Sequence, residues 1–453
     1  MIDRIKNSPK LKWALGVFVG LLLLIFLFYG SIYFGLFGTI PSSKELSELK
    51  QNEATQILSS DGNLIGKYYI FDRQPINFDQ LPEHLINALV ATEDARFFEH
   101  SGIDSRSLFR VFFKSILLQD KSSGGGSTLT LQLAKNLYGR KNYGYFGIVV
   151  NKLQESIIAQ RLEDIYNKNE ILLLYLNTVP FSDNTFGIES ASMKFFDKHT
   201  RELSLEEAAV LVGMLKASHY FNPRIFPERS RLRRDVVLVQ MEKYGYLTAE
   251  EMERAKQKDL VLDYHFYSHD QGLAPYFREQ LRKDVTSILD TLKNKDGESF
   301  NIYRDGLIIH TSLDFEMQEY AEEAVQEHLI ELQQTHEKSY GKNAPWEKDK
   351  GIILDAVKRT AVYKKLNKEG LPDEEILKKL DEDHHEMELF NYKKEELSNA
   401  STLDSIKHYL KFLNAGFLAV EPSTGAVKAW VGGVNYEYFK YDHVSQSKRQ
   451  VGS

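Results

Sequence analysis

The sequence predicts a mostly α-helical protein that begins with a membrane-spanning helix and ends in a smaller region of helices and strands. Three observations support this fold class. Residues 13–37 contain no charged side chain. Residues 82–260 repeat apolar side chains at helical spacing. Near the C-terminus, two short apolar runs flank a turn that contains proline and glycine.

The uncharged segment 13–37 is long enough to cross a hydrocarbon core about 30 Å thick as a helix. Four lysine and arginine residues precede it, and Lys44 is the first positive charge after it. The positive-inside rule therefore places residues 1–12 in the cytoplasm and the chain from about residue 40 outside. A cleaved signal peptide is the alternative, but the segment is longer than a typical signal core and lacks a small-residue cleavage site. We therefore expect an uncleaved, single-pass anchor.

The overall composition excludes some classes of protein. The net charge of -7 gives no reason to expect nucleic-acid binding. Cysteine is absent, so the chain has neither a disulfide framework nor a thiolate metal site. At 453 residues the chain is too long for one ordinary domain.

The segments that follow the anchor differ in their periodicity. Short apolar runs on either side of Asp61-Gly62 predict a β-hairpin. Helical spacing then predicts six helices, at 107–118, 130–138, 149–166, 168–176, 204–216 and 229–244. A strand at 306–311, a helix at 313–334 and a second hairpin at 417–431 follow, and the charged range 335–411 is expected to be a solvated helical insertion.

These patterns give a domain scheme for the whole chain. We expect a cytoplasmic tail at 1–12, a transmembrane helix at 13–37, a juxtamembrane linker and hairpin at 38–75, a helical lobe at 76–255, a linker at 256–305 and an α+β region at 306–453.

Two adjacent acids, Glu93 and Asp94, follow an apolar helical run and precede Phe97, Phe98 and His100. An acid held beside aromatic rings is a candidate general base. Adjacent acids near a helix end more commonly cap the helix or face solvent, so the pair alone does not identify a catalytic site.

A glycine run at 124–126, followed by Ser127 and Thr128, leads directly into a predicted helix. Backbone N–H groups at such a helix start can hold a phosphate. No Lys-Ser/Thr follows at the spacing of a Walker A loop, so a nucleotide site is not indicated. A flexible hinge is the alternative reading, although Lys135 and Lys152 nearby would suit an anionic ligand.

Glu155 lies within the apolar arc of the predicted helix 152–166, beside Ile158, Ala159 and Leu162. A carboxylate on a buried face is costly unless it is paired or used in chemistry. A structural ion pair with an arginine and a functional role both remain open.

Taken together, these residues resemble the glycosyltransferase domain of the class A penicillin-binding proteins, the family 51 peptidoglycan glycosyltransferases. Five motifs of that domain match in order, at 93–102, 126–136, 152–163, 168–177 and 233–241. The resemblance implies a lysozyme-like helical lobe that polymerises lipid II into β-1,4 glycan strands, with inversion and release of lipid diphosphate. It also implies a location in the bacterial cytoplasmic membrane.

The resemblance assigns roles to individual residues. Glu93 would take the proton from the 4-hydroxyl of the acceptor sugar, and Glu155 would assist departure of the diphosphate, directly or through Mg²⁺ or Mn²⁺. No organic cofactor is implied. The implied partners are lipid II, the nascent glycan strand, the bilayer and other proteins of cell-wall synthesis. The implied substrate contacts are Asp94, Phe97, His100, Ser127, Thr128, Gln132, Lys135, Asn136 and Lys152.

Two positions depart from the family's motifs. Leu131 replaces the first residue of a Gln-Gln pair, and Asn151 replaces the arginine that usually precedes the lysine of the third motif. The second change removes a cation from a site that must stabilise a diphosphate. Arg96, Arg140 or Lys141 could compensate for it.

The C-terminal region resembles the opening of a penicillin-binding transpeptidase domain. In that resemblance Ser453 would be the acylated serine of a longer parent chain, which would also be a DD-transpeptidase. The partner lysine, the Ser-x-Asn motif and the Lys-Thr-Gly strand do not follow. We therefore expect an incomplete domain at 306–453, with its insertion at 335–411, and no transpeptidase activity from the chain as given.

Two other functions remain as alternatives. Paired carboxylates on a lysozyme-like lobe also serve glycan hydrolysis. Alternatively, the change at Asn151 would leave a catalytically weakened, membrane-anchored scaffold that binds cell-wall synthesis proteins.

Overall fold

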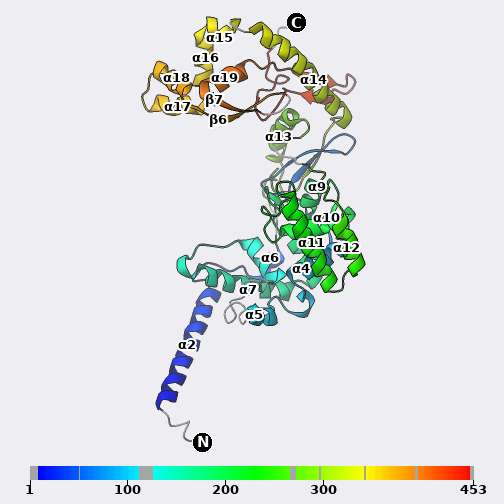
Figure 1. Cartoon of the computed structure of the whole chain (residues 1–453), viewed down its shortest axis with the longest axis vertical. Helices are drawn as coiled ribbons and strands as arrows, with labels where there is room; N and C mark the ends of the chain where they lie inside the picture. The colour runs from blue at the N-terminus through cyan, green and yellow to red at the C-terminus, as the bar shows by residue number, and fades with distance from the viewer. Residues whose placement is uncertain are drawn as a thin grey trace. The chain divides into compact units, whose positions relative to one another are not determined.

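The computed structural model describes residues 9–49, 52–111, 126–265, 272–294, 297–340, 343–392 and 396–448. It confirms the predicted fold class: helices dominate, an apolar helix comes first, and small sheets lie in the C-terminal part (Figure 1). The chain divides into two compact units. Unit 1 is Met1–Ala54, Tyr69–Phe266 and Tyr303–Gly306, and unit 2 is Thr55–Tyr68, Tyr267–Ile302 and Leu307–Ser453.

The first helix, α2 (Pro9–Tyr33), has the composition expected of a membrane span. Among the described residues, its segment Leu15–Tyr33 is the one stretch of helix long and apolar enough to cross a bilayer, with a mean hydropathy of 2.5. The helix ends before the predicted boundary at residue 37. Gly35 and Gly38 have φ angles of 81° and 103°, which an α-helix does not accommodate.

The end of α2 packs against α7 (Gly147–Ile165) within unit 1 (Figure 1). Ile32 is buried together with Val150 and Ile157 of α7. The hydroxyl of Tyr143, just before α7, donates a hydrogen bond to the carbonyl of Phe37. The membrane helix therefore joins the lobe through apolar packing and through polar contacts to the chain that follows it.

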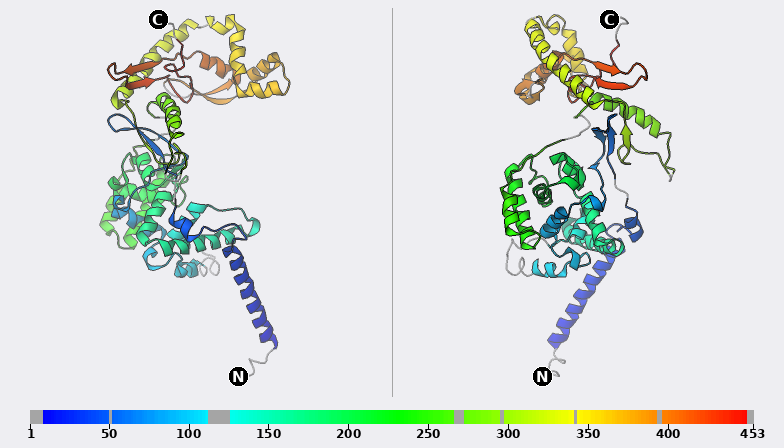
Figure 2. Two further views of the ribbon diagram at one scale, coloured as in Figure 1. Left: turned by 180° about the vertical axis from the view of Figure 1, so that it is seen from behind. Right: turned by 90° about the vertical axis from the view of Figure 1, so that its right-hand side faces the viewer.

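The lobe of unit 1 is built around one hydrophobic core, which its helices enclose (Figure 2). Helix α4 packs against both α10 and α11, and α6 packs against α7 and α8. The helices are α3 (Ser43–Ser47), α4 (Glu83–Glu93), α5 (Ser105–Val111), α6 (Leu129–Tyr138), α7, α8 (Lys168–Thr178), α9 (Ile188–Phe196), α10 (Leu205–Met214), α11 (Pro227–Lys243) and α12 (Ala249–Gln257).

The six helices predicted for the lobe are all present, with boundaries that shift by a few residues. The predicted end of the first of them, after residue 111, lies outside the described residues. Helix α9 was not predicted, because it follows the strained turn at Gly187, where φ is 84°, without a side-chain cap. Helix α12 was missed because it buries little apolar surface, with Ala255 as its one buried residue.

A short parallel sheet and an asparagine attach the segment before α4 to the lobe. Strand β3 (Asp72–Arg73) pairs with β4 (Thr185–Phe186). The side chain of Asn177, at the end of α8, accepts a hydrogen bond from the backbone N–H of Ile76 at 3.1 Å and donates one to its carbonyl at 3.0 Å. The side-chain amide of Asn177 therefore satisfies both backbone polar groups of the buried residue Ile76.

Unit 2 contains the predicted first hairpin, β1 (Thr55–Leu58) and β2 (Leu64–Tyr68), with Gly62 at a φ of 88° in the turn. Strand β1 also pairs in parallel with β5 (Ile308–His310). The sequence predicts this hairpin as part of the segment 38–75, because a partner strand some 250 residues away leaves no local signal. The range 256–305, predicted as a linker, contains helix α13 (Pro275–Leu289).

The second hairpin of unit 2 is confirmed as β8 (Phe417–Val420) and β9 (Val427–Val431), and the predicted helix before the insertion is α14 (Phe315–Tyr340). The solvated helical insertion predicted at 335–411 is largely helical, as expected, but it is not merely a solvated segment. This region has its own core, which includes Trp346, Val357 and Ile376. Its elements are α15 (Pro345–Lys348), α16 (Lys350–Lys358), α17 (Ala361–Lys368), α18 (Asp373–Glu382), β6 (His384–Leu389), β7 (Glu396–Ser401) and α19 (Thr402–Leu410).

The Asn177 contact predicts a measurable loss of stability. Asn177→Ala should reduce the stability of the lobe by about 2–4 kcal/mol, because it leaves a buried N–H and a buried carbonyl without partners. Urea denaturation of the detergent-solubilised chain checks this value. Asn169→Ala, at an exposed position of the same helix, is the matched control and should change the midpoint little. Equal midpoints for the two variants would contradict the assigned role.

Candidate functional site

Glu93 is the last residue of α4, and neighbouring elements hold its side chain in one orientation. The Nε2 atom of Gln132, on α6, donates to its Oε2 at 3.0 Å. The Nη2 atom of Arg233, on α11, lies 3.9 Å from its Oε1. The carboxylate remains 15% exposed, so a ligand can reach it.

Tyr175 of α8 fixes the amide that contacts Glu93. Its hydroxyl donates to Oε1 of Gln132 at 3.0 Å. Burial, and then the negative charge of Glu93, raise the pKa of Tyr175 well above its usual value. The phenol therefore stays protonated and orients the Gln132 amide with its N–H group toward Glu93.

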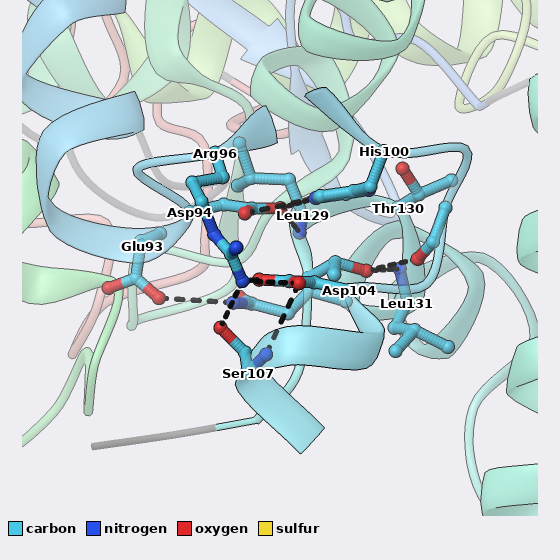
Figure 3. A network of polar contacts seen from close by, with 12 residues as sticks. Glu93, Asp94, Arg96, His100, Asp104, Ser107, Leu129, Thr130 and Leu131 are labelled. Carbon is cyan, nitrogen blue, oxygen red and sulfur yellow. Dashed lines mark hydrogen bonds and ion pairs between the residues drawn. The ribbon is translucent and has the colours of Figure 1, made fainter. Parts of the chain in front are cut away.

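Asp94 joins the end of α4 to the start of α6. One of its oxygens accepts a hydrogen bond from the backbone N–H of Leu129 at 3.0 Å, and Nε2 of His100 lies 3.1 Å from both oxygens. Figure 3 shows the side chains of Glu93 and Asp94 pointing in different directions, with Asp94 directed at His100 and Leu129. The predicted substrate contacts Asp94 and His100 thus bind to each other, and Asp94 also binds the backbone at the start of α6.

Phe97 was also predicted to contact substrate, but it is fully buried in the core of the lobe. Its ring contacts Phe98 and His100, and Nζ of Lys168 lies 4.3 Å from its centroid. The aromatic ring therefore supports the fold of the first motif, because no surface of it remains for a sugar.

Arg96 forms an ion pair with Asp104, at the start of α5 (Figure 3). Burial opposes ionisation of Asp104, but hydrogen bonds from Ser107 and Arg96 outweigh it and lower the pKa of Asp104 to about 2. Arg96 is thereby committed to this local pair, which makes it a poor replacement for the cation missing at position 151.

In the hydroxyl-rich turn before α6, Thr128 and Ser127 make different contacts. Thr128 is buried and caps α6: its hydroxyl accepts from the N–H of Leu131 and donates to the carbonyl of Gly102. Ser127 accepts a hydrogen bond from Nζ of Lys152 at 3.0 Å. The glycines at 124 and 125 lie outside the described residues.

Glu155 lies on the buried face of α7, as predicted, and is 4% exposed at its side chain. Nε of Arg140 lies 2.8 Å from one carboxylate oxygen, and Nζ of Lys152 lies 2.5 Å from the other. The arginine ion pair considered from the sequence is therefore present, together with a second cation. Two positive groups and one negative group leave this cluster with a net positive charge.

The remaining predicted contacts lie on α6, one turn after Gln132. Lys135 is exposed and Asn136 is half-buried. Leu131, the departure from the family's glutamine pair, is 4% exposed. An apolar side chain suits that buried position better than an amide would.

A divalent metal at Glu155 can be tested against the donors present. Mg²⁺ and Mn²⁺ prefer carboxylate, carbonyl and water oxygens. Both oxygens of Glu155 already contact cations, and among the described residues no second carboxylate contacts this cluster. Within the part of the chain that the structure describes, the one group of three acidic or histidine side chains close enough to share a metal is Asp197, Asp263 and His265. The Glu155 cluster does not fit a protein-held metal.

A cavity of about 380 Å³ lies beside Glu155 within unit 1. The segment that follows α2 contributes Ile40 and Glu45, and α6 and α7 contribute Tyr138 and Ile158. Lys141 and Asn151 also line this cavity. A ligand in this cavity would lie between the chain leaving the membrane helix and the Glu155 cluster.

Two residues that build the site were not predicted as site residues. Tyr175 and Arg233 belong to the fourth and fifth matched motifs, which was the only signal for them in the sequence. Ser453 lies outside the described residues, so its role in a longer parent chain stays a prediction. The site as built offers an accessible, oriented carboxylate at Glu93 and a cationic cluster around Glu155.

The sequence of this chain is similar to those of known proteins. Residues 61–242 match the transglycosylase family, and residues 341–413 match the penicillin-binding protein middle domain. Penicillin-binding protein 1A of Aquifex aeolicus is 30% identical over 96% of this chain and 59% of its own length. Penicillin-binding protein 1A of Escherichia coli is 29% identical over 94% of this chain and 52% of its own length.

A crystal structure of penicillin-binding protein 1A from Haemophilus influenzae aligns with 89% of this chain and 51% of its own, at 22% identity and a TM-score of 0.41. The chain spans between about half and three fifths of the length of the curated relatives named above. Within that span, the chain carries the transglycosylase and middle domains of a class A penicillin-binding protein.

Proposed function

We propose that this chain is a membrane-anchored peptidoglycan glycosyltransferase that polymerises lipid II into β-1,4 glycan strands. The observation that carries the proposal is the pairing of two different carboxylate environments on one lobe. Glu93 is accessible and oriented by Gln132, whereas Glu155 is buried between Arg140 and Lys152. The first environment suits a general base, and the second suits the departure of an anion.

In the proposed reaction, Glu93 takes the proton from the 4-hydroxyl of the acceptor sugar as that oxygen attacks the anomeric carbon of the growing chain. The bond between this carbon and the diphosphate oxygen breaks on the opposite face, which inverts the configuration. Negative charge then grows on the leaving lipid diphosphate. Lys152, held by Ser127 and Glu155, is placed to stabilise that charge.

Membrane attachment supports the same function. Helix α2 would hold the lobe at the surface where a lipid-linked substrate diffuses, which raises their effective concentration. We propose that the N-terminus is cytoplasmic and the lobe extracytoplasmic, in the cytoplasmic membrane of a bacterium. The four basic residues before the uncharged segment 13–37 support this orientation.

The central test is polymerisation of purified lipid II by the full chain. Glu93→Gln should reduce the rate of glycan synthesis by about 100- to 10,000-fold, because an amide cannot accept the proton. Gel analysis of the labelled products measures this. Glu228→Gln, at an exposed position of α11, removes a carboxylate outside the site and should leave the rate unchanged.

Three results would contradict the proposal. Cleavage of preformed glycan in place of polymerisation would indicate a hydrolase. A folded wild-type chain that neither polymerises nor cleaves would indicate a scaffold. Full activity of Glu93→Gln would remove Glu93 from the mechanism.

The orientation can be tested because the chain contains no cysteine. In intact spheroplasts, a membrane-impermeant maleimide should label Glu228→Cys, whose parent side chain is 78% exposed. Ser8→Cys should react only after the membrane is opened. The reverse labelling pattern would place the lobe in the cytoplasm and contradict the proposed function.

A further inference from the structure

Asn151, where the family's third motif usually has an arginine, supports a neighbouring backbone segment. Its side-chain oxygen accepts from the N–H of Lys141 at 3.0 Å, and its amide nitrogen donates to the carbonyls of Lys141 and Gly147 at 2.9 and 2.6 Å. The residue is 6% exposed. Its amide thus holds the connection between α6 and α7 against the first turns of α7.

That connection places a different arginine at the site. Gly139 ends α6 with a φ of 66°, a conformation that favours glycine, and Arg140 follows immediately. Nε of Arg140 then lies 2.8 Å from the Glu155 carboxylate. An arginine at 151 would reach the same carboxylate from one turn earlier on the same helix face.

The charge balance shows what Arg140 contributes. Lys152 and Glu155 alone form a neutral pair, so the net positive charge of the cluster comes from Arg140. Its guanidinium has five N–H groups, of which Nε uses one. Among the described residues, none accepts a hydrogen bond from its terminal nitrogens, and the side chain is 47% exposed. These donors face no competing partner there, and their planar arrangement matches a phosphate.

The two other basic residues that could replace the missing cation, Arg96 and Lys141, have different surroundings. Arg96 is paired with Asp104. Nζ of Lys141 lies beside Gly38, 3.5 Å from the point where a Cβ on that glycine would stand, and forms no ion pair with Glu155.

We propose that Arg140 supplies the diphosphate-binding cation that the third motif lacks at position 151, and that Asn151 serves to hold Arg140 in place. The proposed phosphate-binding cation thus lies on the connection before α7 and not on α7 itself. This inference rests on the proposed function, because the ligand is the diphosphate of the lipid-linked donor. It adds to that function a binding residue and an exchange of roles between two positions.

A binding titration tests the inference without requiring activity. Farnesyl diphosphate is titrated calorimetrically into the full chain in detergent, with farnesol as the probe that lacks phosphate. Arg140→Gln should weaken farnesyl diphosphate binding about 10- to 100-fold, because it removes charge-assisted hydrogen bonds. Farnesol binding should not change. Arg201→Gln, which breaks an exposed Arg–Glu pair outside the site, is the matched control and should bind normally.

The decisive variant is the exchange. Arg140→Gln combined with Asn151→Arg should recover most of the lost affinity, because the cation returns to the position used by the family and no longer needs the connection. Farnesol binding, which requires a folded lobe but no phosphate contact, should be the same in the wild-type chain and in both variants, and so separates a loss of folding from a loss of phosphate contacts. The rates of lipid II polymerisation should rank the variants in the same order as their affinities, and kcat/KM should change more than kcat.

Unchanged farnesyl diphosphate binding by Arg140→Gln would overturn the inference, as would a folded double variant that binds no better than the single one. Should Arg140→Gln fail to fold, Arg140→Lys decides: it keeps the charge but loses the planar donors, so several-fold weaker binding is expected and unchanged binding overturns the inference. A wild-type chain that binds the probe but does not polymerise lipid II would refute the proposed function and leave the binding series valid.

Discussion

The hydrogen bond between Asp94 and the backbone N–H of Leu129 is the contact on which the geometry of the site depends. It joins the end of α4 to the start of α6. Glu93 stands directly before Asp94, and Gln132 lies one turn after Leu129, so one contact sets the distance between the proposed base and the amide that orients it. Asp94 and His100 thus hold other parts of the site in place, whereas the Glu93 carboxylate remains accessible for reaction.

Burial of Glu155 imposes the second constraint. A carboxylate that is 4% exposed must be compensated, and Arg140 and Lys152 do so from two different segments. The same compensation concentrates cations at one point, which is what a leaving diphosphate requires. In the proposed mechanism, stability of the lobe and binding of the anion therefore depend on the same ion pairs. Glu155 orients both cations before the ligand arrives.

The sequence predicted the parts of this molecule that have a local signal. The apolar face of α7 placed Glu155 in the interior, and helical spacing placed the start of α10 within one residue. The parts it missed depend on distant partners or on short elements. Strand β5 pairs with β1, which lies far away in the chain. In the region 343–392, the abundance of lysine and glutamate gave no indication of the core that contains Val357 and Ile376. Phe97 was misassigned because an aromatic beside an acid looks the same in a sequence whether it lines a site or fills a core.

Helix α7 connects the membrane anchor to the reacting groups of the proposed mechanism. Its residues Val150 and Ile157 pack against Ile32 of α2, and Glu155 lies between them in sequence on the same rigid element. Gln154 also donates to the carbonyl of Phe37, where the chain leaves the membrane helix. A lipid-linked diphosphate must be handled at a fixed height above the bilayer, because its lipid cannot leave the membrane. Packing the anchor directly against the helix that carries Glu155 sets that height without a flexible linker between them. In the proposed mechanism, the contact between α2 and α7 would therefore take part in substrate recognition as well as in attachment.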